Sequence, residues 1–269
     1  METALDLTGK RIAALIALGL VAGLFSGLFG VGGGLIVVPA LGVLLKIDHK
    51  LAVGTSLMAI VPACTVGIIS YAVTDSVNWT AGLIVAVGAV VGAQVGAKLL
   101  GLISRRTAQW VFIGYIVVVV VQLMILVPDR SADLTITWWS ALGLIGLGLV
   151  AGLAAGLLGI GGGGIVVPVM MIAFGASDLI AKGTSLVMML PGVLSGLVGN
   201  LRGQRVLVKP GLIIGCSAVA TGPLGAWIAH ILPPRIATWV FAVYLIVICA
   251  TMVRQALRTS QSGRAIPER

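Results

Sequence analysis

Two glycine runs are the residues whose type and spacing most clearly suggest chemistry. Each run contains a triplet, Gly32-Gly33-Gly34 and Gly161-Gly162-Gly163, followed by an apolar stretch. Glycine inside a helix costs roughly 1 kcal/mol relative to alanine, so each triplet predicts a break in a helix. A helix that begins after such a break presents free backbone N–H groups and the positive end of its dipole. We therefore predict that the two triplets bind an anion.

The glycines that precede the first triplet have a different interpretation. Gly19, Gly23, Gly27 and Gly30 are spaced four, four and three residues apart, on one face of a helix. This spacing is typical of close contact between membrane helices. We expect these residues to pack against a neighbouring helix, and we reserve the anion site for the triplets.

A second pair of motifs carries hydroxyl groups. Gly54-Thr55-Ser56 and Gly183-Thr184-Ser185 are predicted to open the next long apolar segment in each half of the chain. Hydroxyls there could donate to an oxyanion beside another positive helix end, so the substrate-binding prediction includes Thr55, Ser56, Thr184 and Ser185. The alternative is that they cap the helix or bond back to the preceding turn. The sequence does not decide between these roles.

Four prolines are predicted hinges or kinks. Pro39 and Pro168 follow the last glycine of their runs closely and should lie near the first turn of a short helix. Pro62 and Pro191 lie seven residues after Thr55 and Thr184, inside long apolar segments. Proline removes a backbone donor, so each position is a candidate point of bending.

Three further residues are possible additions to the site: Cys64, Gln94 and Asn200. Cys64 lies two residues beyond Pro62, although a buried thiol that serves only as a small apolar side chain is the commoner case. Gln94 and Asn200 are uncharged polar residues within apolar segments. We favour hydrogen bonds between helices as their role, with substrate contact as the alternative.

Several kinds of chemistry have no support in the sequence. All eight acidic residues lie in the tails or short connectors, and the three cysteines form no metal-binding pattern. The apolar segments contain no acid–base pair, so we expect no metal, no cofactor, no enzymatic activity and no proton relay of the usual kind.

The elements that position these residues are membrane helices. The chain is 59% hydrophobic and 9% charged, and its apolar residues form long uninterrupted blocks. This composition predicts an all-α polytopic membrane protein, since barrel strands would alternate in polarity. Ten apolar segments are predicted, at 12–28, 35–45, 51–73, 79–100, 107–127, 138–158, 164–174, 180–200, 210–231 and 237–253. The second segment of each half is too short to span, which predicts a broken or re-entrant pair at the glycines.

The chain is an internal duplication. Residues 19–39 recur at 148–168 with sixteen of twenty-one positions identical, an offset of 148 − 19 = 129 residues. The same offset places Gly54-Thr55-Ser56-Leu57 on Gly183-Thr184-Ser185-Leu186 and Pro62 on Pro191. We therefore predict two repeats, 1–130 and 131–269, within one integral membrane domain.

Charge predicts how the repeats are oriented. If each repeat crosses the membrane an odd number of times, fourteen of the 17 basic residues collect on one side, and only Arg130, Lys182 and Arg235 remain on the other. This bias predicts two inverted repeats in a bacterial or archaeal inner membrane, with both termini cytoplasmic. Topology thus explains the net charge of +9, and no nucleic-acid partner is expected.

The glycine block that ends in Val-Pro, together with the following Gly-Thr-Ser-Leu, is present twice and resembles the sulfite exporter TauE/SafE family, also called the toluene-sulfonate uptake permease family. The resemblance implies a carrier for small anions, commonly sulfite, sulfoacetate, thiosulfate or other sulfonates. We expect alternating access at a central site between the repeats, with the bilayer and a small anion as partners. An anion channel and a membrane assembly partner are the alternatives. A homo-oligomer is a candidate partner, with the oligomeric state left open.

Overall fold

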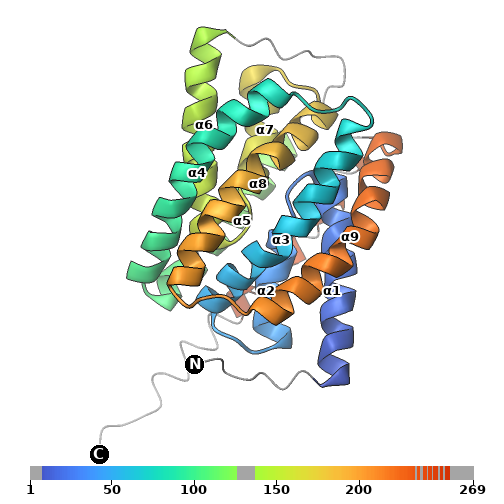
Figure 1. Cartoon of the computed structure of the whole chain (residues 1–269). Coiled ribbons are helices and arrows are strands. Elements are labelled where there is room, and N and C mark those ends of the chain that lie inside the picture. The colour runs from blue at the N-terminus through green and yellow to red at the C-terminus, as the bar shows by residue number, and fades with distance from the viewer. Residues whose placement is uncertain are drawn as a thin grey trace, which may run out of the picture.

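Helices make up most of the residues that the computed structural model describes, which are 8–125, 137–233 and most of 235–254. The labelled helices in chain order are α1 (Gly9–Phe29), α2 (Gly34–Leu44), α3 (His49–Ala72), α4 (Trp79–Leu102), α5 (Arg105–Ile125), α6 (Trp138–Leu158), α7 (Gly163–Phe174), α8 (Asp178–Arg202) and α9 (Val208–Ile231) (Figure 1). The stretch 235–254 is also helical where it is described. The all-α prediction is therefore confirmed for this part of the chain.

Six of these helices, α1, α3, α4, α6, α8 and α9, are long and apolar enough to cross a membrane. In contrast, α2 and α7 contain only 11 and 12 residues. At about 1.5 Å per residue, each covers roughly half of a ~30 Å hydrocarbon core. The predicted short second segment is thus present in both halves. Its boundary at the glycines is as expected.

The first helix of each half packs against the fourth helix of the other half. α1 packs along α9, and α6 packs along α4. A Cβ added at Gly23 of α1 would lie 2.6 Å from Cα of Ala218 on α9. A Cβ added at Gly152 of α6 would lie 2.7 Å from Cα of Ala89 on α4. Glycine allows both close approaches, which confirms for Gly23 the packing role that its spacing in α1 predicted.

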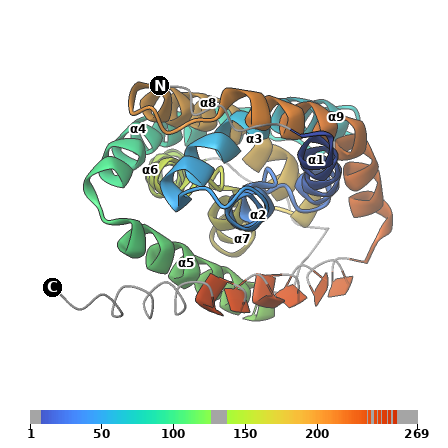
Figure 2. The same ribbon diagram turned by 90° about the horizontal axis from the view of Figure 1, so that it is seen from below.

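The short helices lie inside this framework. Figure 2 shows α2 and α7 overlapping in the middle of the view, with α3, α8 and α9 to one side and α5 with the 235–254 stretch to the other, whereas in Figure 1 α2 lies toward one end of the molecule and α7 toward the other. The apolar residues of α2 are largely buried, among them Leu35, Val37 and Leu41. The long helices therefore hold the two glycine breaks within the core.

Candidate functional site

The two glycine breaks have the same backbone geometry. α1 ends at Gly30, whose φ is 68°, and Gly32 and Gly33 also have positive φ, at 71° and 75°. The second break repeats these values closely at Gly159 (70°), Gly161 (80°) and Gly162 (87°). Residues with a Cβ rarely adopt this left-handed conformation. The breaks predicted from the triplets are therefore present, and the backbone explains their glycines.

The two breaks touch each other. A Cβ added at Gly34 would collide with the carbonyl oxygen of Gly159. A Cβ added at Gly163 would lie 2.5 Å from the carbonyl oxygen of Gly30. Residues 30–34 and 159–164 are all buried. Segments 129 residues apart in the sequence thus form one backbone contact in the interior, and this contact requires glycine on both sides.

Both half-helices begin at this contact. The hydrogen bonds of α2 start with the N–H groups of Ile36 and Val37, which donate to Gly33 O at 3.0 and 3.1 Å. Those of α7 start with Ile165 and Val166, which donate to Gly162 O at 3.1 and 3.2 Å. The first N–H groups of a helix have no carbonyl of the same helix to bond. Here these groups belong to Gly34 and Leu35 in α2 and to Gly163 and Gly164 in α7. Two positive helix ends therefore meet, an arrangement that can stabilise an anion.

Two apolar side chains occupy the space facing the breaks. The methyl group of Met189 fills the place that a Cβ on Gly32 or on Gly161 would take, and its sulfur lies 2.9 Å from a Cβ position at Gly163. Ile60 occupies the position in the first repeat equivalent to Met189, and its Cδ1 lies 2.8 Å from a Cβ position at Gly34. Both side chains are fully buried. In this conformation apolar atoms cover the glycines.

Ile60 and Met189 were not among the predicted site residues. The signal was their position two residues before Pro62 and Pro191, at equivalent places in the repeat. Cys64, a possible site residue, is buried at the first break, with Sγ 3.5 Å from a Cβ position at Gly32. The equivalent residue, Val193, is 3.6 Å from a Cβ position at Gly161.

The two predicted serines lie at the breaks and bind carbonyl groups there. Ser185 Oγ is 2.7 Å from Gly30 O and 2.7 Å from Lys182 O. Ser56 Oγ has the equivalent partners, Gly159 O and Val53 O, also at 2.7 Å. Each hydroxyl carries one hydrogen, which the two acceptors share. The serines therefore compensate the carbonyls at the ends of α1 and α6 and tie these ends to α8 and α3.

The two predicted threonines connect helices elsewhere. Thr55 Oγ1 donates to Leu51 O at 2.7 Å and accepts from the N–H of Leu207 at 2.9 Å. Thr184 Oγ1 accepts from the N–H of Asn78 at 2.9 Å. Bonding back to the preceding turn is thus confirmed for Thr55 and for the serines. A substrate contact for the four hydroxyls stays a prediction.

One expectation about these motifs was wrong. Thr55 and Thr184 do not open their helices, because α3 already begins at His49 and α8 at Asp178. Both threonines are therefore the seventh residue of their helix, almost two turns from its positive end. The polar residues before Thr55 read as a connector in the sequence, whereas packing extends the helix through them.

Gln94 and Asn200 lie between helices. Gln94 Nε2 donates to Ser195 O at 2.7 Å, which confirms the predicted bridge, here from α4 to α8. Asn200 Nδ2 donates to Gly196 O in its own helix at 3.0 Å, and its Oδ1 accepts from Arg205 Nε at 3.2 Å. Arg205 completes the connection to α4 by donating to Ala97 O at 3.0 Å. Burial lowers the pKa of Arg205, because it disfavours the charged form.

The four predicted hinge prolines lie inside continuous helices. Pro39 and Pro168 are the sixth residues of α2 and α7, in the second turn and not the first. Pro62 and Pro191 are the fourteenth residues of α3 and α8, near the middle. Each interrupts the ladder of helix hydrogen bonds. Hinge motion at these positions stays a prediction.

One acidic residue does not lie where the sequence analysis expected. Asp178 begins α8 instead of belonging to an exposed connector, and it is only 2% exposed. It forms an ion pair with Lys182, with 3.2 Å between Oδ2 and Nζ. This burial was not predictable from the sequence, because Asp178 follows a short stretch that resembles a surface loop.

These features define the class of the protein. Six helices capable of spanning a membrane, buried glycine breaks and largely apolar exposed surfaces are those of a polytopic helical membrane protein. Comparison with known families is consistent with this class and narrows it. The sulfite exporter TauE/SafE family matches residues 4–123 and 144–269, and the chain belongs to this family.

Relatives span nearly the whole chain. The probable membrane transporter protein YunE of Bacillus subtilis is 26% identical over 267 residues, covering 90% of this chain and 97% of its own. A probable membrane transporter protein of Haemophilus influenzae is 28% identical over 262 residues, with the same shares. One from Methanocaldococcus jannaschii is 24% identical over 240 residues, covering 82% of this chain and 87% of its own. No solved structure matches the chain.

Proposed function

We propose that this protein transports a small anion across the membrane, with a sulfur-containing oxyanion or organosulfonate of the sulfite, sulfoacetate or thiosulfate type as the favoured substrate class. The observation that carries the proposal is the buried contact between the two glycine breaks, where α2 and α7 both begin. Two positive helix ends favour an anion without a cationic side chain. The family supports the sulfur class, and its members named above are probable membrane transporters.

The proposal includes an inverted arrangement of the repeats 1–130 and 131–269. Two hydrogen bonds support it. Thr184, near the start of α8, accepts from Asn78, just beyond the end of α3, and Thr55, near the start of α3, accepts from Leu207, just beyond the end of α8. The equivalent helices α3 and α8 therefore run past each other in opposite directions. Together with the basic residues, this supports a bacterial or archaeal inner-membrane protein with cytoplasmic termini.

Alternating access at the breaks would proceed by movement of the apolar side chains that cover them. When Met189 and Ile60 withdraw, the N–H groups at the starts of α2 and α7 can receive the anion. The serines remain on the carbonyls of Gly30 and Gly159, which keeps these oxygens paired. Pro62 and Pro191 follow the covering residues by two positions and are the hinges proposed for α3 and α8.

Binding and flux measurements test this function. We expect one or more anions from a panel of sulfite, thiosulfate, sulfoacetate, taurine, sulfate, phosphate and small carboxylates to stabilise the purified protein thermally. In proteoliposomes, saturable uptake and counterflow of the same anion would support a carrier. A large unitary conductance would support an anion channel instead, and the absence of any binding or flux would support a non-transporting assembly partner.

A further inference from the structure

A tyrosine on α5 reaches the second glycine break. The hydroxyl oxygen of Tyr115 occupies the place that a Cβ on Gly164, in the first turn of α7, would take. α7 contacts both α5 and α8, and in Figure 2 it lies between them. Tyr115 therefore approaches the start of α7 from α5, whereas Met189 approaches it from α8.

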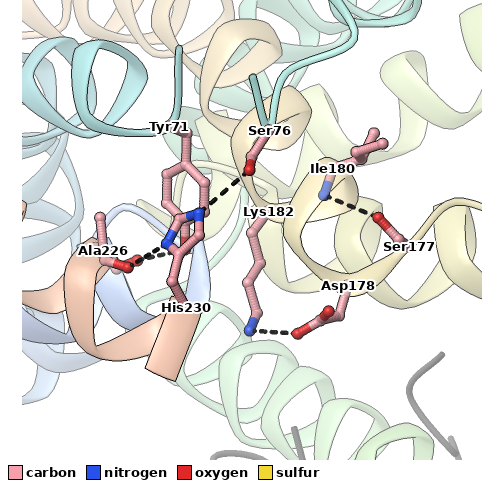
Figure 3. A network of polar contacts seen from close by, with 9 residues as sticks. Tyr71, Ser76, Ser177, Asp178, Ile180, Lys182, Ala226 and His230 are labelled. Carbon is pink, nitrogen blue, oxygen red and sulfur yellow. Dashed lines mark hydrogen bonds and ion pairs between the residues drawn. The ribbon is translucent and has the colours of Figure 1, made fainter. Parts of the chain in front are cut away.

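The Tyr115 hydroxyl is buried, and no described residue forms a hydrogen bond with it. Buried tyrosine hydroxyls usually have a partner. Tyr71, the other tyrosine within the described residues, lies beside His230 (Figure 3) and donates to Gly27 O at 2.7 Å. A buried hydroxyl without a partner destabilises the folded protein, so its presence at Tyr115 needs a reason other than packing.

The last glycine of the second run also needs a reason. Among the three glycines before it, two have positive φ and the third faces the opposite break, so the backbone explains them. Gly164 has no positive φ, and the first repeat has Leu35 at the equivalent position. The start of the half-helix therefore accepts a side chain at this position in one repeat and lacks one in the other.

The Tyr115 hydroxyl explains this glycine. A Cβ added at Gly164 would collide with the hydroxyl oxygen, whereas the next nearest atoms are Cζ of the same ring at 3.5 Å and Cγ2 of Val119 at 3.7 Å. The two longer distances are ordinary van der Waals contacts. A single oxygen atom thus excludes a side chain at position 164, and glycine there leaves the hydroxyl at the start of α7.

The groups that meet at this place are hydrogen-bond donors. The N–H groups of Gly163 and Gly164 have no carbonyl of α7 to bond, and the hydroxyl of Tyr115 bonds neither of them. An acceptor with several lone pairs can take hydrogen bonds from all three groups. An oxyanion is such an acceptor, and hydrogen bonds to an ionised group are the stronger kind.

We propose that Tyr115 binds the transported anion, an inference that rests on the proposed function. Its hydroxyl donates a hydrogen bond to an oxygen of the anion, which the N–H groups of Gly163 and Gly164 also bind. The hydroxyl already lies at the start of α7 in the conformation described, so the covering side chain of Met189 is the part that moves. The partner that the hydroxyl lacks in the protein is the substrate.

Removal of the hydroxyl tests this role, because a structural role predicts the opposite change in stability. Tyr115→Phe keeps the ring and removes a buried hydroxyl without a partner, so the thermal midpoint of the anion-free protein should rise by about 2 °C. Anion affinity should fall by roughly ten- to a hundredfold, because a hydrogen bond to a charged group is lost. The probes are the anions of the panel above: sulfite, thiosulfate, sulfoacetate, taurine, sulfate, phosphate and small carboxylates.

Tyr71→Phe is the matched control, since it makes the same chemical change at a hydroxyl that has a partner. It should lower the thermal midpoint and leave anion affinity within about twofold of the wild type. Thermal unfolding and equilibrium binding of the purified proteins measure both quantities for the two variants.

A second pair of variants tests the position of the hydroxyl. Gly164→Ala puts a methyl group where the hydroxyl lies, so anion affinity should fall about as far as in Tyr115→Phe. Without the hydroxyl, the methyl group meets only ordinary contacts. The double variant should therefore bind the anion about as well as Tyr115→Phe alone. Losses of affinity that add in the double variant would contradict the proposal.

The possible failures can be told apart. If the wild type binds an anion and Tyr115→Phe binds it equally well, Tyr115 does not contact the anion, and the proposed function stands. If Tyr115→Phe lowers the thermal midpoint as Tyr71→Phe does, the hydroxyl has a structural role and the proposal is overturned. If the wild type binds no anion of the panel, the proposed function is wrong, and the role of Tyr115 is wrong with it.

Discussion

The glycine breaks and the ends of the molecule differ in how closely the two repeats match. At the breaks the match extends to single contacts: Ser56 and Ser185 bond Gly159 O and Gly30 O at the same 2.7 Å, and Gly34 and Gly163 each approach the opposite break. At the ends it is lost. One end carries Tyr71, Ser76 and His230, where the other has Asn200, Arg205 and Gly101.

This difference has a structural reason. The two breaks touch each other, so each half supplies a matching set of residues there. At the ends, the equivalent positions of the two halves carry different side chains. Substitutions at the breaks and at the ends test this difference.

The largest effects are expected where the breaks touch. Gly34→Leu or Gly163→Leu drives a side chain into the carbonyl of Gly159 or Gly30, and we expect loss of anion binding with a destabilisation of about 3 kcal/mol or more. Thermal unfolding and anion-induced stabilisation of the detergent-solubilised variants measure both. Gly146→Ala is the control, since a Cβ there meets open space and replaces a helical glycine. Equal tolerance of Gly34→Leu and Gly146→Ala would show that the breaks do not need glycine.

The next largest effect concerns the side chains that cover the breaks. Met189→Ala should destabilise the protein by roughly 2–5 kcal/mol, because it empties a buried volume. It should also raise anion affinity, by roughly tenfold, if withdrawal of Met189 limits access to the N–H groups. Equilibrium binding measures the affinity, and Met189→Leu, which keeps the volume, should change it little. An unchanged or weaker affinity in Met189→Ala would contradict the covering role.

Smaller effects are expected at the serines. Ser56→Ala and Ser185→Ala each leave a buried carbonyl at the end of α6 or α1 without its hydroxyl, at a cost of about 1–3 kcal/mol. Thermal unfolding should show similar losses for the two variants, because their contacts are equivalent. Thr65→Val provides the comparison, since Thr65 bonds only its own helix near the surface. A strong loss in one serine variant alone would show that the breaks are not equivalent.

The smallest effect is expected at the polar end. Tyr71→Phe removes one hydrogen bond, from Tyr71 to Gly27 O, and keeps the ring on His230, so we expect a loss of only about 1 kcal/mol. Thermal unfolding measures it, and anion affinity should remain within about twofold of the wild type. A large loss of affinity would move the anion site from the breaks toward this end.

Much of the fold was predictable from the sequence, because a helix that spans a membrane needs a long run of apolar residues, and such runs can be seen in the sequence. The half-length helices, the breaks at the triplets and the glycine stripe on α1 all follow from composition and spacing. The start of α3 was not predicted, since the polar residues from His49 to Lys50 resemble a connector until packing makes them helical. Helix ends are set by tertiary contacts as much as by local preference.

The site was predictable in its backbone and much less so in its side chains. Glycines at positive φ are specified locally, so the triplets identified the breaks. Ile60 and Met189 look like ordinary core residues in the sequence, and only their three-dimensional position at the breaks distinguishes them. Asp178 was missed for a related reason. Whether an acid next to a helix start is buried depends on helices distant in the sequence.

The proposed function depends on binding of an anion at the contact between the two breaks. The most direct test is nuclear magnetic resonance of protein labelled with ¹⁵N-glycine, titrated with an anion that stabilises it in the binding screen. We predict that the backbone N–H signals of Gly34 and Gly163 shift together and saturate at the same anion concentration. Shifts confined to glycines at the ends of the molecule, with Gly34 and Gly163 unchanged, would contradict the claim.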